Sequence, residues 1–297
     1  MSNNFSGAIA PSELIVTNKG TIYHLDLAPE QLANTVITVG DPDRVGSVSK
    51  HFDRITHRAQ HREFVTHTGY IGSKQLSVVS TGIGPDNIDI VFNELDALVN
   101  IDFATRKVKP ETRSLNIIRL GTCGGLQPDV PADSFVVSSY AVGLDNLLHY
   151  YIAENDADEA GLLQAFAAQT PFANAGIRPY ITRSSDALRS HFTDGFVHGV
   201  TATCPGFYAP QGRMLRKPIA FPGLPETLAA FSHGQHRIVN FEMETSAIYG
   251  LGKLLGHEYL SISTVVANRS NKTFSTDAVG AVDRMIRKSL EIISGLQ

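Results

Sequence analysis

Apolar segments of two kinds alternate along this chain. Short β-branched and apolar runs predict strands, and they occupy residues 35–39, 64–70, 75–80, 115–120, 134–139, 178–182, 199–203 and 259–267. Longer amphipathic segments predict helices over residues 87–99, 240–255 and 276–296. Because strands alternate with helices throughout, the pattern predicts an α/β sandwich around a mixed sheet. No linker rich in Pro, Gly and Ser interrupts it, so we expect a single domain over residues 1–297.

The composition narrows the function classes. The chain has 297 residues, of which 42% are hydrophobic, and this is enough to bury a large core. A net charge of −4 with interspersed signs gives no basic stripe for nucleic acid. No apolar run approaches the ~20 residues that span a bilayer, and the first residues lack the pattern of a secretory signal. The two cysteines lie far apart, so we expect a reducing, cytoplasmic location.

Glycine-rich and polar segments follow three of the predicted strands. They are GDPDR at residues 40–44, STGIG at 80–84 and RLGTCGG at 119–125. Ligands of open α/β sheets bind at the carboxyl ends of strands. Backbone N–H groups, hydroxyls and guanidinium groups there are the parts of a phosphate cradle. Because neither GxxxxGK[ST] nor GxGxxG occurs, free phosphate is favoured over a nucleoside triphosphate or a dinucleotide. The alternative is that each segment is an ordinary turn with a surface arginine.

Two acidic residues open the predicted helix over residues 240–255. In NFEMETSA, Glu242 and Glu244 flank Met243. Positions i and i+2 do not share a helical face, so one carboxylate is expected to enter a pocket while the other supports it or caps the helix. Such a carboxylate can accept hydrogen bonds from the two adjacent hydroxyls of a ribose. The alternative is that both are helix-start acids favoured by the helix dipole.

The segment FYAPQGR, residues 207–213, mixes stacking and hydrogen-bonding groups. A solvated loop does not require Phe207, and a core segment does not normally hold Gln211 and Arg213. An aromatic face beside a small set of donors and acceptors suits a flat heterocycle. This segment is therefore a candidate base-binding site.

Taken in order, GDPDR, HREF (61–64), STGIG, RLGTCGG, FYAPQGR and FEMETSA resemble the nucleoside phosphorylase family, and within it the uridine phosphorylases. The resemblance runs from about His24 to the end, which makes residues 1–22 an N-terminal extension. It implies a three-layer α/β/α sandwich around a mixed, partly barrel-like sheet. The implied enzyme is a pentosyltransferase, a glycosyltransferase of nucleoside catabolism and pyrimidine salvage. It converts uridine and phosphate reversibly to uracil and ribose 1-phosphate. Phosphate is a co-substrate, and no cofactor is expected.

The resemblance also implies residue roles, with Arg119, Arg213 and Glu244 as the catalytic residues. Phosphate would be bound by Gly40, Arg44, Arg119, Thr122 and, from the neighbouring chain, Arg62. Ribose would be bound by Glu242, Met243, Glu244 and, from the neighbouring chain, His24. The base would be bound by Phe207, Gln211 and Arg213. These roles require a homodimer with shared active sites, alone or as three dimers in a hexamer.

The sequence departs from the bacterial pattern after STGIG. Pro85-Asp86-Asn87 stands where the bacterial enzymes have Gly-Pro-Ser, a neighbourhood that some relatives use with the glutamate of HREF, here Glu63, to bind potassium. We therefore expect no metal. We expect Cys123 to be a packing residue and Asp145 to be a turn residue, neither with a catalytic role.

Three functions remain open from the sequence. They are a uridine phosphorylase, a purine nucleoside phosphorylase or nucleosidase of the same family, and a catalytically silent nucleoside-binding protein. Purine members typically place an Asp after the strand that precedes the last helix. Here Asn268-Arg269 stands at that point, which favours a pyrimidine.

Overall fold

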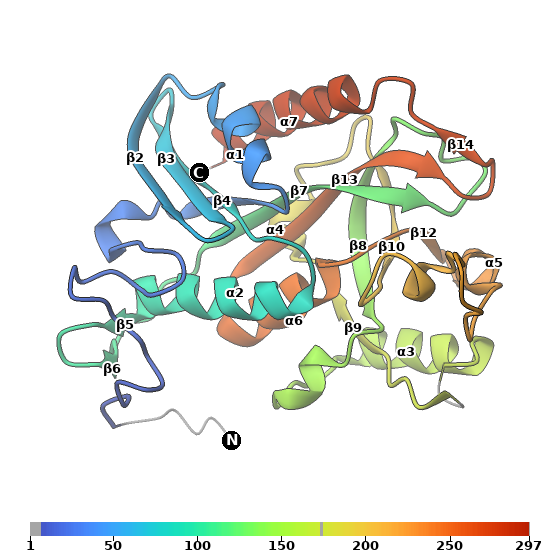
Figure 1. Cartoon of the computed structure of the whole chain (residues 1–297), viewed down its shortest axis with the longest axis horizontal. Coiled ribbons are helices and arrows are strands. Elements are labelled where there is room, and N and C mark those ends of the chain that lie inside the picture. Colours follow the sequence, from blue (N-terminus) through green and yellow to red (C-terminus); the bar gives the residue numbers. More distant parts are fainter. Residues whose placement is uncertain (1–6, 173–174, 297) are drawn as a thin grey trace.

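One twelve-stranded sheet organises the chain (Figure 1). The computed structural model describes residues 7–172 and 175–296. The sheet order is β11-β12-β10-β8-β13-β7-β1-β4-β3-β2, with β14 paired to β13 and β9 to β8. The strands are β1 (Thr35–Val39), β2 (Arg54–His61), β3 (Phe64–Ile71), β4 (Lys74–Ser80), β7 (Asn116–Gly125), β8 (Phe135–Gly143), β9 (Tyr180–Arg183), β10 (Val197–Thr203), β11 (Ser232–His233), β12 (His236–Glu242), β13 (Glu258–Asn268) and β14 (Thr273–Phe274). A separate hairpin consists of β5 (Ile101–Asp102) and β6 (Lys107–Val108).

Part of the sheet closes on itself. Besides its parallel partner β10, strand β12 pairs antiparallel with β7, where Asn240 lies opposite Gly125 and Phe241 opposite Gly124. Strands β7, β13, β8, β10 and β12 therefore form a five-stranded barrel, which we call the barrel below. The predicted mixed, partly barrel-like sheet is confirmed.

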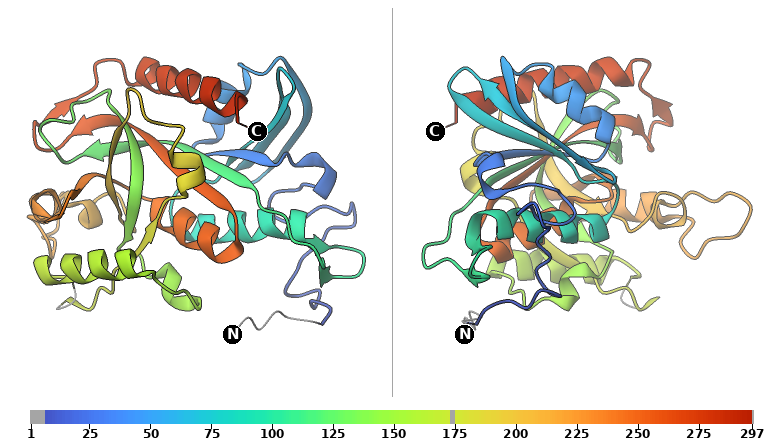
Figure 2. Two further views of the ribbon diagram at one scale, coloured as in Figure 1. Left: turned by 180° about the vertical axis from the view of Figure 1, so that it is seen from behind. Right: turned by 60° about the vertical axis from the view of Figure 1, so that its left-hand side comes forward.

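Helices cover both faces of the sheet and make the predicted three layers (Figures 1 and 2). Helices α2 and α6 pack on one face through a core that includes Phe92 and Ile248. Helices α1, α4 and α7 pack on the other through a core that includes Val45, Leu188 and Met285. Helices α3 and α5 cover the end formed by β8, β10 and β12. The helices are α1 (Pro42–Ser49), α2 (Pro85–Asn100), α3 (Ala157–Gln169), α4 (Asp186–Arg189), α5 (Leu224–Ala230), α6 (Thr245–Leu255) and α7 (Ala278–Ser294).

Two predicted boundaries were wrong, and both matter for the site. The strand predicted over residues 115–120 continues to Gly125, because residues 119–125 pair with β13 along one edge and the last two also pair with β12. RLGTCGG is therefore strand and not a turn. The helix predicted over residues 240–255 begins at Thr245, because residues 240–242 complete β12.

The N-terminal segment is joined to the rest by specific contacts. Leu14 and Ile22 are buried in the core that contains α2. The Arg106 side chain, next to β6, donates a hydrogen bond of 2.7 Å to the carbonyl of Ile9. Among the described helices, none has the length and apolarity that crossing a membrane requires.

Candidate active site

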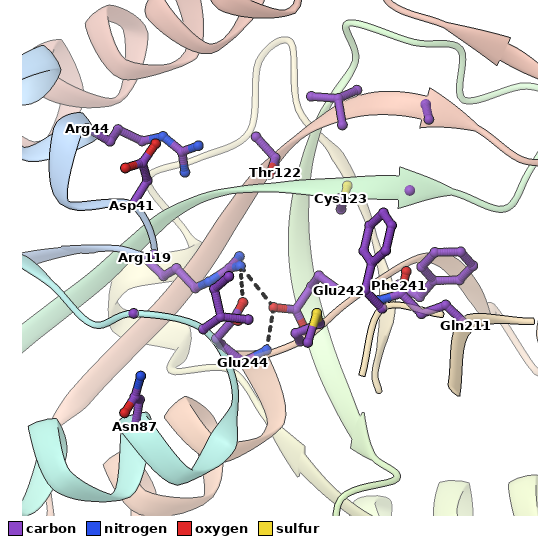
Figure 3. A pocket seen from close by; sticks show the side chains of 18 of the residues that line it. Asp41, Arg44, Asn87, Arg119, Thr122, Cys123, Gln211, Phe241, Glu242 and Glu244 are labelled. Carbon is purple, nitrogen blue, oxygen red and sulfur yellow. Dashed lines mark hydrogen bonds and ion pairs between the residues drawn. The ribbon is translucent and has the colours of Figure 1, made fainter. Parts of the chain in front are cut away.

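A cavity of about 860 Å³ opens where β1, β4 and β12 end (Figure 3). It brings together all the site residues predicted from within the chain. These are Gly40, Arg44, Arg119, Thr122, Phe207, Gln211, Arg213, Glu242, Met243 and Glu244. The remaining two, His24 and Arg62, do not line it.

Arg119 lies on the floor of the cavity and is almost fully buried. Its side chain projects from within β7, and position 119 falls inside the strand predicted over residues 115–120. Its Nη2 atom lies 2.6 Å from Oε2 of Glu244 and 3.1 Å from Oε2 of Glu242, and its Nη1 donates to Ser263 Oγ at 3.0 Å. Burial opposes the charged form, but the two carboxylates outweigh it and raise the pKa of Arg119. This guanidinium is therefore a permanently charged group held from several sides.

Gly121 makes this arrangement possible. The guanidinium of Arg119 lies over Gly121, two residues further along the same face of β7. A Cβ atom added to Gly121 would come within 2.1 Å of Arg119 Nη1. Only glycine leaves room for the arginine at this position.

Glu242 is fully engaged by the chain itself. At the end of β12, its carboxylate accepts hydrogen bonds from Thr203 Oγ1 at 2.7 Å, from the N–H of Glu244 at 2.8 Å and from the N–H of Thr245 at 3.0 Å. The last two N–H groups belong to the N-cap residue and the first residue of α6, so the Glu242 carboxylate satisfies backbone donors at the start of that helix, where a negative charge is favourable. Together with its ion pair to Arg119, this makes Glu242 a support for the neighbouring groups.

Glu244 is the carboxylate that ties three elements together. It occupies the N-cap position of α6, and its Oε1 accepts a hydrogen bond of 2.9 Å from the N–H of Gly84 at the start of α2. Gly84 has φ +98°, a conformation that favours glycine. Burial raises the pKa of Glu244, while Arg119 opposes the rise. The carboxylate is thus fixed between a cation and a backbone donor at the cavity floor.

Arg44 provides a second guanidinium. It lies in the first turn of α1, after β1, and is half-buried. Within the described residues its side chain makes no hydrogen bond or ion pair. Burial lowers the pKa of Arg44, and repulsion by Arg119 lowers it further. Two guanidinium groups that face one space, with Thr122 beside them (Figure 3), suit an anion with several oxygens.

Residues 207–213 form the far end of the cavity. The Cζ atom of Arg213 stands 3.8 Å from the centre of the half-exposed Phe207 ring. Arg213 Nη1 donates to the carbonyl of Phe207 at 2.7 Å and to Oε1 of Gln211, which is buried. Arg213 and Arg269 also approach the Phe241 ring, at 5.7 and 5.8 Å from its centre. The result is aromatic surface beside amide and guanidinium donors.

His24 and Arg62 lie together on another part of the surface. Arg62 is exposed in the turn between β2 and β3 with φ +55°. The His24 ring is held by Glu94, whose Oε1 lies 2.7 Å from His24 Nδ1. His61, next to Arg62, places its Nδ1 3.3 Å from the carbonyl of His24. Both predicted neighbour-chain residues therefore belong to one patch, and Glu63 of the same turn lines the cavity.

Some lining residues were not predicted from the sequence. Phe241, Val266 and Phe274 border the cavity. Phe241 could have been found because it directly precedes Glu242, but nothing in the pattern singles out Phe274, which is 78% exposed. Asp145 is not the simple turn residue that we expected, since it is largely buried and accepts hydrogen bonds from Tyr180 and Ser246 behind the start of α6.

Residues 7–172 and 175–296 contain no group of three or more His, Cys, Asp or Glu side chains that could hold a metal ion. Burial raises the pKa of the Cys123 thiol to about 12, so this cysteine in the cavity wall stays protonated near neutral pH.

Proteins of known sequence and structure share this architecture. A uridine phosphorylase of Thermococcus kodakarensis is 29% identical over 264 residues, which are 87% of this chain and 81% of that protein. A uridine phosphorylase of Escherichia coli is 28% identical and covers 86% of this chain and 89% of its own. A Trypanosoma brucei nucleoside phosphorylase, described as showing uridine phosphorylase activity, superposes with a TM-score of 0.86 at 30% identity. That superposition covers 95% of this chain and 100% of the other.

A purine nucleoside phosphorylase from Toxoplasma gondii has the same fold, with a TM-score of 0.64, 20% identity, and 94% and 98% of the two chains covered. The resemblance to nucleoside phosphorylases, with uridine phosphorylases among them, is confirmed, and so is the expectation of an enzyme. The family model described as Phosphorylase superfamily matches residues 34–294, and this chain belongs to that family.

Proposed function

We propose that this chain is a uridine phosphorylase, which converts uridine and phosphate reversibly to uracil and ribose 1-phosphate. One observation carries the proposal. A single cavity has two guanidinium groups at one end, Glu244 on its floor, and Phe207 with Gln211 and Arg213 at the other end. That order matches phosphate, ribose and base.

In this proposal, Arg44 and Arg119 hold phosphate, with Thr122 and the backbone at Gly40 completing the cradle. Glu244 orients the ribose by accepting hydrogen bonds from its hydroxyls, and Met243 packs against the sugar. Glu242, whose oxygens are already occupied, keeps Glu244 and Arg119 in place. Holding phosphate and nucleoside side by side lowers the entropic part of the activation barrier. For well-oriented reacting groups this gain reaches about 7–11 kcal/mol.

The chemical step breaks the bond from C1′ to the base and forms a bond from C1′ to a phosphate oxygen. The electron pair of the broken bond leaves with uracil, so negative charge develops on the base. Arg213 and Gln211 are placed to stabilise that charge, and a well-placed donor of this kind contributes about 3–4 kcal/mol. The uracil anion then takes the proton that the attacking hydrogen phosphate gives up, and no covalent bond to the enzyme forms.

Three observations weigh against the alternatives. Asn268 stands where purine members have their acid, and it is buried away from the cavity: its Nδ2 donates to the carbonyls of Gln127 and Val130, both at 2.8 Å. A nucleosidase, which uses water, has no need for the two guanidinium groups of Arg44 and Arg119. A silent binding protein has no need for the ion pair between Arg119 and Glu244.

We also propose that two chains share each site. His24 and Arg62 lie outside the cavity of their own chain, yet both belong to one surface patch. A neighbouring chain could therefore insert them together, His24 toward the ribose and Arg62 toward the phosphate. The homodimer, alone or within a hexamer, and a cytoplasmic location remain predictions.

The test is the phosphate dependence of nucleoside cleavage by the purified protein. Uridine should be cleaved only with phosphate present, and ribose 1-phosphate should form in equal amounts with uracil. Inosine, the matched purine substrate, should be cleaved far more slowly. Uridine cleavage in phosphate-free buffer would instead indicate a nucleosidase, faster cleavage of inosine a purine phosphorylase, and binding without turnover a silent protein.

A further inference from the structure

A second cavity, of about 840 Å³, lies apart from the active site. It is bounded by the first half of α3, the middle of β8, the start of β10 and the turn between β11 and β12. Helix α3 lies beside β8 and β9 in both Figures 1 and 2. We call this the basic cavity, and it shares no lining residue with the active site.

Basic side chains from several elements converge on it. They are Arg183 of β9, Arg189 of α4, His198 of β10, His233 of β11 and His236 of β12. Asp158, which is exposed, is the one acidic residue among the described residues that line it. Two arginines and three histidines therefore face one hollow, with the carboxylate of Asp158 beside them.

The two arginines share one close carboxylate partner. Both pair with the same carboxylate, that of Asp186, at 3.3 Å for Arg183 and at closer range for Arg189. The Nε atom of Arg189 is buried and has no hydrogen-bond partner among the described residues. Asp156 and Asp158 also act on Arg183, so the chain balances much of the charge of the two arginines, but the buried Nε of Arg189 leaves a donor for another anion.

The histidines are placed beside one another. His233 and His236 are register partners in the β11–β12 hairpin. The His236 ring meets the ring of Tyr140 edge-on, with centres 5.0 Å apart. Burial lowers the pKa of His236, His233 and Arg189 lower it further, and Asp158 opposes the change. No three of the described His, Cys, Asp or Glu side chains form a metal-binding group, so an anion fits better than a metal.

The size and lining of the cavity indicate what the anion is attached to. Its volume nearly equals that of the active-site cavity, which is proposed to hold phosphate and a nucleoside together. Bare phosphate would leave most of it empty. Ser139, Gln235 and backbone at Gly199 and Gly234 supply polar groups suited to hydroxyls. We propose that the basic cavity is a second binding site, which takes a phosphorylated sugar with its phosphate against Arg183 and Arg189.

The experiment is calorimetric titration of the full chain with ribose 5-phosphate. The test variant is Arg183→Ala/Arg189→Ala, and the matched control is Arg44→Ala, which removes a guanidinium from the other cavity. Wild type and Arg44→Ala should bind ribose 5-phosphate with similar affinity, whereas the double variant should bind at least about tenfold more weakly, since charge-assisted bonds are lost. Its uridine cleavage should stay at the wild-type rate, which also shows that it folds.

A second variant tests the proposal even if the double variant does not fold. His233→Gln changes an exposed residue of the hairpin, and it should weaken binding several-fold. Three results would overturn the proposal: no binding by wild type at millimolar concentrations, unchanged binding in both cavity variants, or loss of binding in Arg44→Ala alone. An affinity no higher than that of inorganic phosphate, or equal to that of uncharged ribose, would overturn the assignment to a phosphorylated sugar. None of the binding outcomes depends on which nucleoside the active site cleaves.

Discussion

Arg119 Nη2 and Glu244 Oε2 lie 2.6 Å apart on the floor of the active-site cavity. The proposed phosphate ligand and the proposed ribose ligand therefore form one buried ion pair, while Arg44 on the cavity wall has no such partner among the described residues. The two arginines should for that reason respond differently to removal.

Arg119→Ala should lower the free energy of unfolding by about 3–5 kcal/mol, because it leaves Glu242 and Glu244 buried without their cation. Arg44→Ala should lower it by less than about 1 kcal/mol but should raise the KM for phosphate roughly ten- to a hundredfold, as expected for one charge-assisted bond. Urea unfolding and phosphate-dependent kinetics measure both. Equal losses of stability in the two variants would contradict the assigned roles.

Arg213→Ala should reduce kcat for uridine cleavage by about 10²–10³ because it removes a donor to the departing base. Its effect on stability should be small, since the guanidinium is only partly buried. Arg216→Ala is the matched control: this exposed arginine, three residues further along the chain, does not line the cavity. A near wild-type kcat/KM in Arg213→Ala would rule out the base-binding role.

Mixing two inactive variants tests whether chains share sites. Arg62→Ala and Glu244→Ala should each be nearly inactive alone. In a mixed dimer with two equivalent sites, one site has both residues intact and the other has neither, so each mixed dimer should recover about half of the wild-type activity. Native mass spectrometry verifies that mixed dimers form. If they form without any recovery, Arg62 serves its own chain or no site at all.

The stability contribution of Asp145 should depend on pH. Burial raises its pKa above the ordinary 3.8, despite hydrogen bonds from Leu147, Tyr180 and Ser246. A carboxyl whose folded-state pKa is raised stabilises the protein below the unfolded pKa, and this contribution is lost as the pH rises through the folded value. Wild type should therefore lose stability relative to Asp145→Asn as the pH rises from about 4 to 7.

At Asp129 we expect the opposite change of stability with pH. Its hydrogen bond from Arg237 lowers its pKa, so wild type should gain stability relative to Asp129→Asn as the pH rises through the acidic range. The gain should be small because the pair is exposed. Urea unfolding at several pH values measures how the stability difference between wild type and each variant changes with pH. If both differences changed in the same direction, the assigned environments of Asp145 and Asp129 would be wrong.

Gly121→Ala should impair both activity and stability, because the added Cβ would displace the Arg119 guanidinium. Gly46→Ala is the matched control within α1, where an added Cβ meets nothing within 4 Å. It should raise the free energy of unfolding by about 0.5–1 kcal/mol, as usual for glycine in a helix. Wild-type kinetics in Gly121→Ala would show that Arg119 tolerates displacement.

The pattern of apolar residues predicted strands β1, β3, β4, β7, β8, β9, β10 and β13 and helices α2, α6 and α7, because burial on one or both faces determines it. It did not predict helices α1, α3, α4 and α5 or strand β12, whose last residues it assigned to a helix. It missed β2, whose sequence RITHRAQH is mostly polar because the strand lies at the edge of the sheet with alternate residues exposed. It also ended β7 too early, since Gly124 and Gly125 look like a turn. In the folded chain these glycines instead allow β12 to approach β7.

The candidate site was predictable where its residues stand in motifs and unpredictable where they depend on distant partners. Glu242 and Glu244 were recognised as a pair, but their common contact with Arg119 joins positions more than a hundred residues apart. The hydrogen bond between Glu94 and His24 joins residues that are seventy positions apart, and no local sequence pattern predicts it. The basic cavity likewise draws its basic side chains from five elements that only the fold assembles.

The closure of the barrel has a consequence for the motions of the enzyme. The hydrogen bonds between β7 and β12 join strands that are remote in sequence, so they can open only when much of the molecule unfolds. Amide hydrogens at this seam should be among the slowest to exchange with solvent. Arg119, Thr122 and Glu242 stand on these two strands, and their backbone therefore serves as a fixed frame. We therefore expect the movements that admit substrate or release product to occur in segments outside the barrel. Residues 204–223 and 269–277 are such segments, and they place Phe207 and Phe274 at the cavity.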